Sequence, residues 1–94
     1  MARNTIEHIA FEHGFDSQSI VCMEECAELI KAISKYKRKP CDKRWNNLIY
    51  ELADVEIMVE QMVYLLDADL IFEEAIREKV ARELKRIEEA KNGS

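Results

Sequence analysis

The sequence contains very few residues that can stop a helix. In 94 residues there are two glycines, Gly14 and Gly93, and one proline, Pro40. The segments between them are rich in Glu, Lys, Ala, Leu, Ile and Met, which favour helix formation. Because glycine and proline are the residues that most often end a helix, the chain is predicted to be nearly all α-helix, with its joints near these three positions.

Four helices are predicted, one short and three long. The first spans about 5–13 and ends at Gly14, because glycine readily adopts the backbone conformation that closes a helix. The second begins at a cap formed by Asp16 or Ser17, whose side-chain oxygens can accept hydrogen bonds from the first turn. It is expected to run to residue 36 or 37.

The segment KRKPCDK at 37–43 is the clearest loop, since Pro40 prevents a helix from continuing through it. Asp42 is expected to cap a third helix over about 43–66. After a short acidic break, a fourth helix is expected over about 70–91.

The second and third helices carry apolar residues at a 4-3-4 spacing, which places them along one face. Other apolar residues widen that face, so each helix is expected to pack against more than one neighbour. A short chain cannot supply so many neighbours, and the core of the all-α bundle is therefore expected to be completed in a homodimer or homotetramer. The fourth helix has one narrow apolar stripe among many charges and is expected to be mostly a solvated outer face.

The composition limits the class of protein. At 94 residues the chain is expected to form one domain over residues 1–94, and a composition that is 48% hydrophobic and 35% charged is not that of a disordered chain. It has no apolar run near the roughly 18 to 20 residues of a membrane-spanning helix, so no membrane partner is expected. The net charge of −5 disfavours nucleic acid as a partner. The start, MARNTIEHIA, lacks the order of a secretory signal, which predicts a cytoplasmic protein.

Three cysteines, Cys22, Cys26 and Cys41, show no repeated spacing. An odd number in a chain without a secretory signal does not indicate a disulfide framework. A zinc half-site at Cys22 and Cys26 has no matching second pair of Cys or His elsewhere in the sequence. Buried thiols are the preferred interpretation.

Two acidic pairs interrupt the segments that form the predicted core. Glu25 and Glu28 are three residues apart on the second helix, and Glu51 and Asp54 repeat that spacing on the third. If these helices pack antiparallel across the Pro40 loop, the four carboxylates converge and repel one another unless a cation neutralises them. Mg²⁺ and Mn²⁺ prefer such oxygen ligands. The alternative is that both pairs are solvated helix edges.

The sequence EECAE at 24–28, followed after 22 residues by ELAD at 51–54, resembles the EExxE…ExxD signature of the MazG-like all-α nucleoside triphosphate pyrophosphohydrolases. The similarity extends over about residues 18–66 and more loosely over the last helix. It implies a fold of four helices and an Mg²⁺-dependent hydrolase. The implied reaction cleaves a nucleoside triphosphate between the α and β phosphates, giving a monophosphate and pyrophosphate.

The resemblance also implies roles for individual residues. Glu25, Glu28, Glu51 and Asp54 match the metal ligands of the family pattern. Glu28 is the candidate for orienting the attacking water, and Glu24 is the adjacent acid that supports the site or binds the metal through water.

Substrate contacts are expected from basic and aromatic residues. In the family the last helix offers basic residues to the triphosphate, and Lys79 and Arg82 match those positions, although Ala81 stands where relatives often carry Asn. Lys35 is a candidate for holding phosphates and Trp45 for stacking on a base. For each of these residues, surface charge or packing is the alternative interpretation.

The competing hypothesis for function is a non-enzymatic helical dimerisation or interaction module, whose acids only solvate the bundle. It predicts that divalent cations leave stability unchanged. A di-iron carboxylate bundle is disfavoured because that site needs Glu-x-x-His pairs, and the sequence has none.

Overall fold

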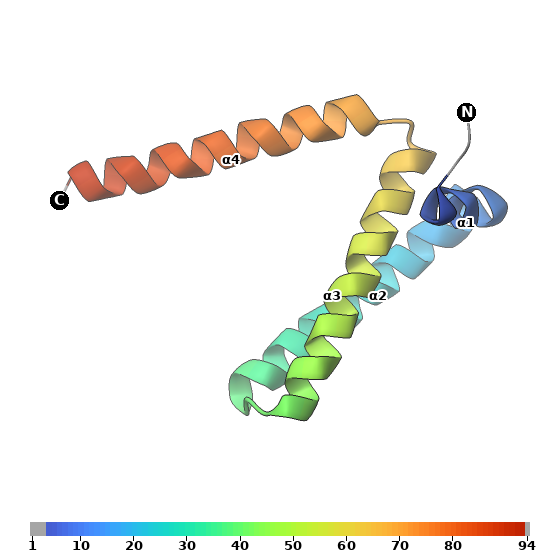
Figure 1. Ribbon diagram of the computed structural model, residues 1–94, viewed down its shortest axis with the longest axis horizontal. Helices are drawn as coiled ribbons and strands as arrows, with labels where there is room; N and C mark the ends of the chain where they lie inside the picture. The colour runs from blue at the N-terminus through green and yellow to red at the C-terminus, as the bar shows by residue number, and fades with distance from the viewer. Residues whose placement is uncertain (1–3, 94) are drawn as a thin grey trace.

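The computed structural model describes residues 4–93, so residues 1–3 and 94 of the predicted domain lie outside the described part. Within residues 4–93 the chain forms four α-helices and no strand (Figure 1). The helices are α1 (Thr5–His13), α2 (Phe15–Arg38), α3 (Asp42–Leu65) and α4 (Asp69–Asn92). The prediction of an all-α chain with one short and three long helices is confirmed.

The start of α1 and the junction with α2 follow from local hydrogen bonding. Asn4 and Glu7 form a capping box in which the Asn4 side chain accepts from the Glu7 amide at 2.8 Å. Gly14 ends α1 with φ 84°, a conformation that glycine adopts without strain. The same residue precedes α2, which starts at Phe15 without a side-chain cap. The predicted cap at Asp16 or Ser17 is therefore wrong, because the glycine turn lets the second helix start immediately.

The two later junctions differ from each other. The chain leaves α2 at Arg38, passes Pro40 and starts α3 at Asp42. Cys41 is the N-cap and makes no side-chain hydrogen bond, so the prediction that Asp42 is the cap is wrong. Asp42 instead lies in the first turn, where its negative charge favours the helix N-terminus. Between α3 and α4, Asp67 has φ 53°, a left-handed conformation that turns the chain sharply.

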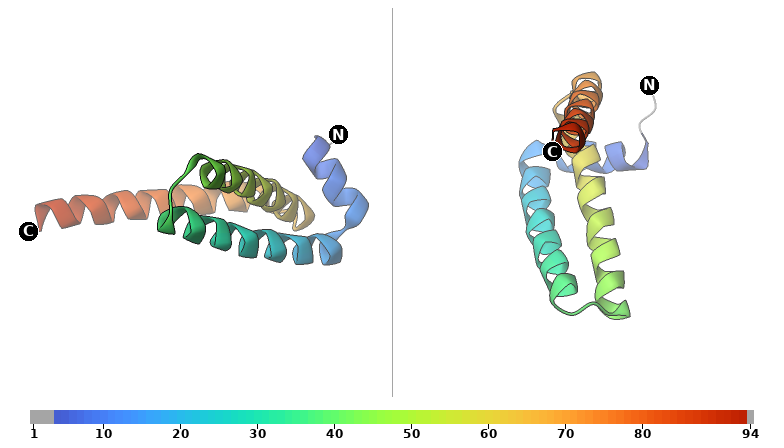
Figure 2. Two further views of the ribbon diagram at one scale, coloured as in Figure 1. Left: turned by 90° about the horizontal axis from the view of Figure 1, so that it is seen from below. Right: turned by 90° about the vertical axis from the view of Figure 1, so that its left-hand side faces the viewer.

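The α2 and α3 helices form an antiparallel hairpin, and α1 packs across its open end (Figures 1 and 2). A buried hydrogen bond of 2.7 Å runs from Gln18 Nε2 on α2 to Gln61 Oε1 on α3. Because a buried amide without a partner is unfavourable, this contact helps fix the register of the two helices. Asn4 Nδ2 also donates to Glu60 at 3.2 Å, which links the start of α1 to α3.

The α4 helix projects away from the hairpin and meets α3 only near their junction (Figure 1). The radius of gyration is 17.0 Å, against about 12 Å for a compact chain of this length. None of the residues of α4 is buried. The four predicted helices are thus present, but only three of them pack together within one chain.

The core of a single chain is very small. Among the described residues, the buried hydrophobic side chains are Ala10, Ala32 and Met58. The thiol prediction is wrong for Cys26 and Cys41, which are exposed, and Cys22 is half-buried. Cys26 lies on an apolar face of α2 that the described chain does not cover, and Cys41 lies in the turn before α3. No helix in residues 4–93 has the length and apolar character required to cross a membrane.

Candidate metal centre

The hairpin brings three of the predicted acidic residues together. Glu25 projects from α2, and Glu51 and Asp54 project from adjacent turns of α3. One carboxylate oxygen from each residue lies within 4.8 Å of the other two. In the part of the chain that the structure describes, this is the one such group of His, Cys, Asp or Glu side chains. We refer to Glu25, Glu51 and Asp54 as the acidic cluster.

The cluster is electrostatically strained in the absence of a cation. Glu25 and Glu51 are half-buried, whereas Asp54 is exposed. Desolvation raises the pKa of Glu25 above its ordinary value of 4.5, and the neighbouring charges of Asp54 and Glu51 raise the pKa further. A hydrogen bond with Asp54 and the charge of Glu28 act in the same direction. These are the effects expected of carboxylates held close together at a helix interface.

One oxygen of the cluster has no partner of its own. Glu51 Oε2 is buried and makes no hydrogen bond. A buried acceptor without a donor is unfavourable by about 1–3 kcal/mol, and more when it is charged. A hard divalent cation would satisfy this oxygen and offset the mutual repulsion of the three carboxylates. The donor set, which consists of carboxylate oxygens, therefore fits Mg²⁺ or Mn²⁺ better than a softer metal.

Glu28 lies one turn from Glu25 and is not part of this group. Its carboxylate instead pairs with Lys31 Nζ at 3.8 Å, and its side chain is 54% exposed. Such exposed ion pairs contribute little stability, so a different rotamer of Glu28 is readily accessible. Of the four predicted ligands, the structure therefore brings three together, and the fourth, Glu28, lies beside them on α2.

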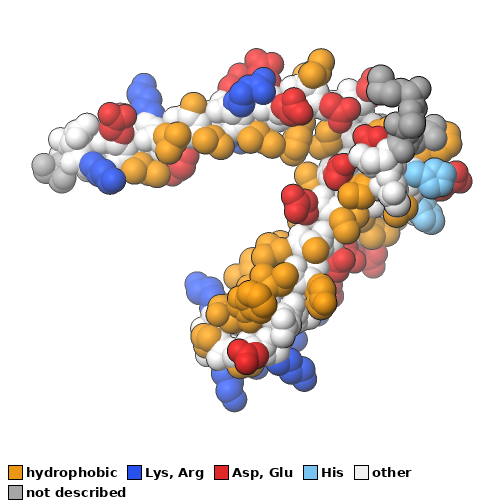
Figure 3. Space-filling view, in the orientation of Figure 1, with side chains coloured by type: hydrophobic (Ala, Val, Ile, Leu, Met, Phe, Trp, Pro, Cys, Tyr) orange, Lys and Arg blue, Asp and Glu red, His pale blue; other side chains and the backbone are white. Residues whose placement is uncertain are grey.

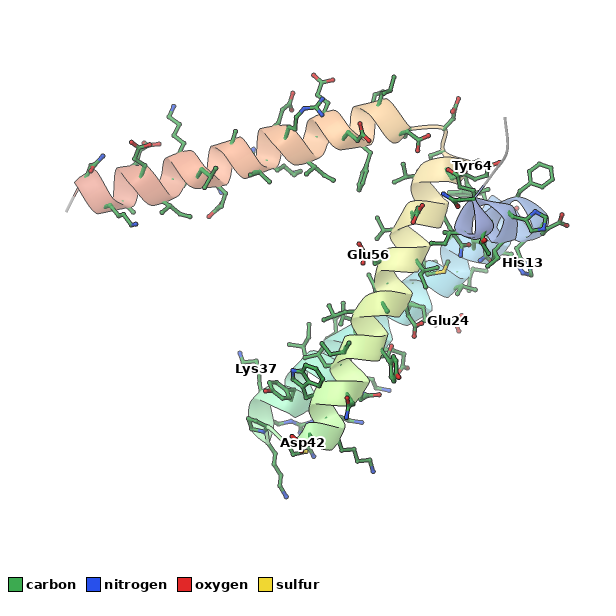
Figure 4. The ribbon with its side chains drawn as sticks, in the orientation of Figure 1. His13, Glu24, Lys37, Asp42, Glu56 and Tyr64 are labelled. Atoms are coloured by element: carbon green, nitrogen blue, oxygen red, sulfur yellow. The ribbon has the colours of Figure 1, made fainter. Side chains whose placement is uncertain are left out.

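Glu24, the predicted supporting acid, is exposed on α2 and does not belong to the acidic cluster. Figure 4 shows it on the side of the hairpin opposite to Glu56. Consecutive residues of a helix point about 100° apart, so Glu24 and Glu25 cannot both point into the interface with α3. The structure leaves the supporting role of Glu24 as a prediction.

Trp45 lies near the turn of the hairpin and is 50% exposed. Together with Tyr36, Pro40, Cys41 and Asp42 it lines an open cavity of about 520 Å³. Nine residues separate Trp45 from Asp54, which corresponds to two and a half helical turns and places the two side chains on opposite sides of α3. Within one chain, Trp45 therefore does not face the acidic cluster.

The three basic candidates also lie away from the cluster. Lys35 is exposed on α2, ten residues and about 15 Å along the helix from Glu25. Lys79 and Arg82 are exposed on α4 and, with Ala75 and Glu78, line a cavity of about 320 Å³. Because α4 points away from the hairpin, a single chain does not bring these two residues to the carboxylates (Figure 1).

The structure also reveals a second acidic feature that the sequence analysis did not identify. A groove of about 400 Å³ lies between α3 and α4 near their junction, with an apolar floor that includes Phe72 and Ile76. Its carboxylates come from three helices, and none of its lining residues is basic: Glu7, Glu56, Glu60, Asp69 and Glu73. We call this the acidic groove. The i,i+4 spacing of two of its pairs is visible in the sequence, but the angle between α3 and α4 is not.

Arg44 was likewise missed. Its Nη1 atom donates to the carbonyl oxygen of Lys35 at 2.7 Å, which ties the end of α2 to the start of α3. In the sequence it appears only as part of a basic run around Pro40, so nothing distinguishes it from the neighbouring surface charges.

Compared with protein-family models, curated proteins and solved structures, the chain matches none.

Proposed function

We propose that the protein is a metal-dependent hydrolase that cleaves a nucleoside triphosphate between its α and β phosphates, in the manner of the MazG-like enzymes, and acts on the cytoplasmic nucleotide pool. The observation that carries the proposal is the acidic cluster, in which oxygens of Glu25, Glu51 and Asp54 lie within 4.8 Å of one another. The buried, unpartnered Glu51 Oε2 supports it, because the carboxylates of a solvated helix edge are hydrogen-bonded to water and are not buried.

In this proposal Glu25, Glu51 and Asp54 hold the cation, which is Mg²⁺ or Mn²⁺. When bound, the cation supplies Lewis acidity toward phosphate oxygens and lowers the pKa of a bound water. The carboxylates are supplied by two packed helices, so their positions are largely fixed before substrate arrives. The chain uses no Ser, Cys or His nucleophile.

Glu28 accepts a hydrogen bond from the attacking water and orients it, after turning away from Lys31. It also has the freedom to complete the ligand set, since it lies one turn along α2 from Glu25. Glu24 supports the site from the solvent side. Trp45, Lys35, Lys79 and Arg82 remain candidates for the base and phosphate contacts.

The active form is an oligomer, either a homodimer or a homotetramer. The support is the number of large apolar side chains that one chain leaves exposed on α2, α3 and α4. Large exposed apolar surface on a small protein usually marks an interface. A second copy also offers a route by which basic residues of an α4 helix can approach a cluster, because each α4 points away from its own hairpin (Figure 1).

The test is pyrophosphate release from a panel of nucleoside triphosphates, with Mg²⁺ and with a chelator. Asp54→Asn keeps the size of the side chain and removes one ligand charge. A ligand that supplies several kcal/mol of stabilisation corresponds to a loss of turnover of roughly 100-fold or more. The matched control is Asp16→Asn, which makes the same change at an exposed position on α2, nine residues from Glu25.

Metal-dependent turnover that Asp54→Asn abolishes and Asp16→Asn leaves intact would support the enzyme. The absence of turnover on every nucleotide, with a melting temperature that Mg²⁺ and Mn²⁺ do not change, would refute it. The remaining hypothesis would then be the non-enzymatic helical interaction module.

A further inference from the structure

The α4 helix carries an apolar stripe that the rest of the described chain leaves largely uncovered. Its residues recur every three or four positions and are exposed to between 37% and 61%: Phe72, Ile76, Val80, Leu84 and Ile87. The helix is 24 residues long, which corresponds to roughly 36 Å, and none of its residues is buried. Figure 3 shows apolar side chains along the side of α4 that faces the hairpin. A helix of this kind gains most of its stability from a partner.

The charge of α4 changes sign along its length. Residues 69–78 contain four acidic and one basic side chain, whereas residues 79–92 contain five basic and three acidic ones. Two parallel copies would place like charges side by side. Two antiparallel copies would place the acidic half of each against the basic half of the other, which is favourable.

The acidic groove adds further negative charge beside the N-terminal, acidic half of α4. It lies at the acidic end of α4, where Asp69 and Glu73 line it together with Glu56 and Glu60 of α3, and its lining includes Phe72 and Ile76 of the apolar stripe. A ligand that matches it has an apolar face flanked by positive charge. The basic half of α4 has that character, since Leu84 and Ile87 lie beside Lys85 and Arg86.

We infer that α4 is the interface between two copies of this chain, which pair antiparallel along the stripe with the basic half of each α4 seated in the acidic groove of the other. This inference deepens the oligomer in the proposed function and requires neither metal nor nucleotide. The twofold axis passes near Val80, the centre of the stripe. It places Ile76 beside the partner's Leu84, and the same contact repeats on the other side of the axis.

The first experiment measures mass by light scattering for the wild type and two Ile→Asp variants. Ile87→Asp places a charge in the stripe, whereas Ile71→Asp makes the same change at a position that is 73% exposed and lies on the opposite face of α4. The wild type is expected to have at least twice the chain mass of 11.0 kDa. Ile87→Asp is expected to halve the wild-type mass and Ile71→Asp to leave it unchanged. A monomeric wild type, or equal behaviour of the two variants, overturns the inference.

The second experiment tests the antiparallel direction. In a background of Cys22→Ser, Cys26→Ser and Cys41→Ser that retains the wild-type mass and helicity, chains with Ile76→Cys are mixed with chains with Leu84→Cys and oxidised. A disulfide requires the two Cα atoms to lie within about 7 Å. Antiparallel pairing predicts a disulfide between the two kinds of chain.

The same experiment excludes the other arrangements of α4. Antiparallel pairing separates two copies of residue 76 by about 12 Å along the helix, so each variant alone should not cross-link. Disulfides between identical chains would indicate parallel pairing. The absence of any disulfide would indicate that the stripe packs elsewhere, for example on the partner's hairpin. Either result overturns the inference, and neither depends on whether the protein hydrolyses nucleotides.

Discussion

The α2–α3 hairpin and the α4 helix are built from helices of the same length, 24 residues each, but are stabilised differently. The hairpin contains a buried hydrogen bond between Gln18 and Gln61, the buried side chain of Met58 and the acidic cluster. The α4 helix has none of these and buries no residue. The comparison shows that contacts within one chain organise the hairpin, whereas the described residues give α4 few such contacts.

The largest expected effect on stability is that of truncating a core side chain of the hairpin, and its dependence on protein concentration should differ from that of a truncation on α4. Met58 is only 5% exposed, and Met58→Ala should lower the free energy of unfolding by about 2–5 kcal/mol, because it removes a packed side chain and leaves a cavity. That loss should be the same at every protein concentration. If α4 pairs as proposed, the effect of Leu84→Ala should instead depend on protein concentration, because a partner chain would cover this side chain.

Urea denaturation of both variants over a hundredfold range of protein concentration checks this contrast. If the loss for Leu84→Ala were as independent of concentration as that for Met58→Ala, then α4 would be stabilised within its own chain and the comparison would fail.

An intermediate effect is expected at the buried amide pair of the hairpin. Gln18→Ala leaves the Gln61 side chain buried without its 2.7 Å hydrogen bond and should lower the free energy of unfolding by about 1–3 kcal/mol. Replacing both residues together, by Gln18→Leu and Gln61→Leu, should recover most of that loss, since no buried amide then remains unpaired. A double variant that is less stable than Gln18→Ala would contradict this explanation, because the loss would then not come from an unpaired buried amide.

The smallest effect is expected in the pH dependence of the metal-free protein. The pKa of Glu25 is raised on folding, so the folded state binds more protons than the unfolded state in the range above its ordinary value of 4.5. The free energy of unfolding should therefore fall as pH rises through that range. The destabilisation by the Glu25 charge should be fully absent only below pH 4.5, where Glu25 is protonated in both states. Thermal melts in chelator from pH 4 upward, for the wild type and Glu25→Gln, measure the difference.

Glu25→Gln has no charge to titrate, so its stability should depend less on pH and should exceed that of the wild type at neutral pH. Equal pH profiles for the two proteins would mean that the carboxylates do not interact as their separation indicates.

Much of this architecture follows from the sequence, because helix limits depend on local chemistry. Gly14 and Pro40 mark two of the three junctions, and the three-residue spacing of Glu51 and Asp54 predicts that both face α2. The same reasoning could have separated Trp45 from the cluster, since nine residues place it on the opposite face of α3.

Other features depend on tertiary structure and could not be predicted in this way. The direction of α4 follows from the left-handed conformation of Asp67. Because this residue is not glycine, the sequence does not indicate that it adopts this conformation. The rotamer that turns Glu28 toward Lys31 depends on the local balance of charge and solvent. The exposure of Cys26 reflects the absence of a covering helix, which apolar periodicity alone does not reveal, whereas Cys41 is exposed in the turn between α2 and α3.

The central claim is that Glu25, Glu51 and Asp54 form a divalent-cation site. The most direct test is to measure the melting temperature of the wild type and of Glu51→Gln, each in chelator, in Mg²⁺ and in Mn²⁺. A ligand at about 100 times its dissociation constant stabilises the folded state by about 2.7 kcal/mol. The wild type should therefore melt several degrees higher with either metal, whereas Glu51→Gln should be more stable than the wild type in chelator and gain little from metal. A wild-type melting temperature that neither metal changes would contradict the account.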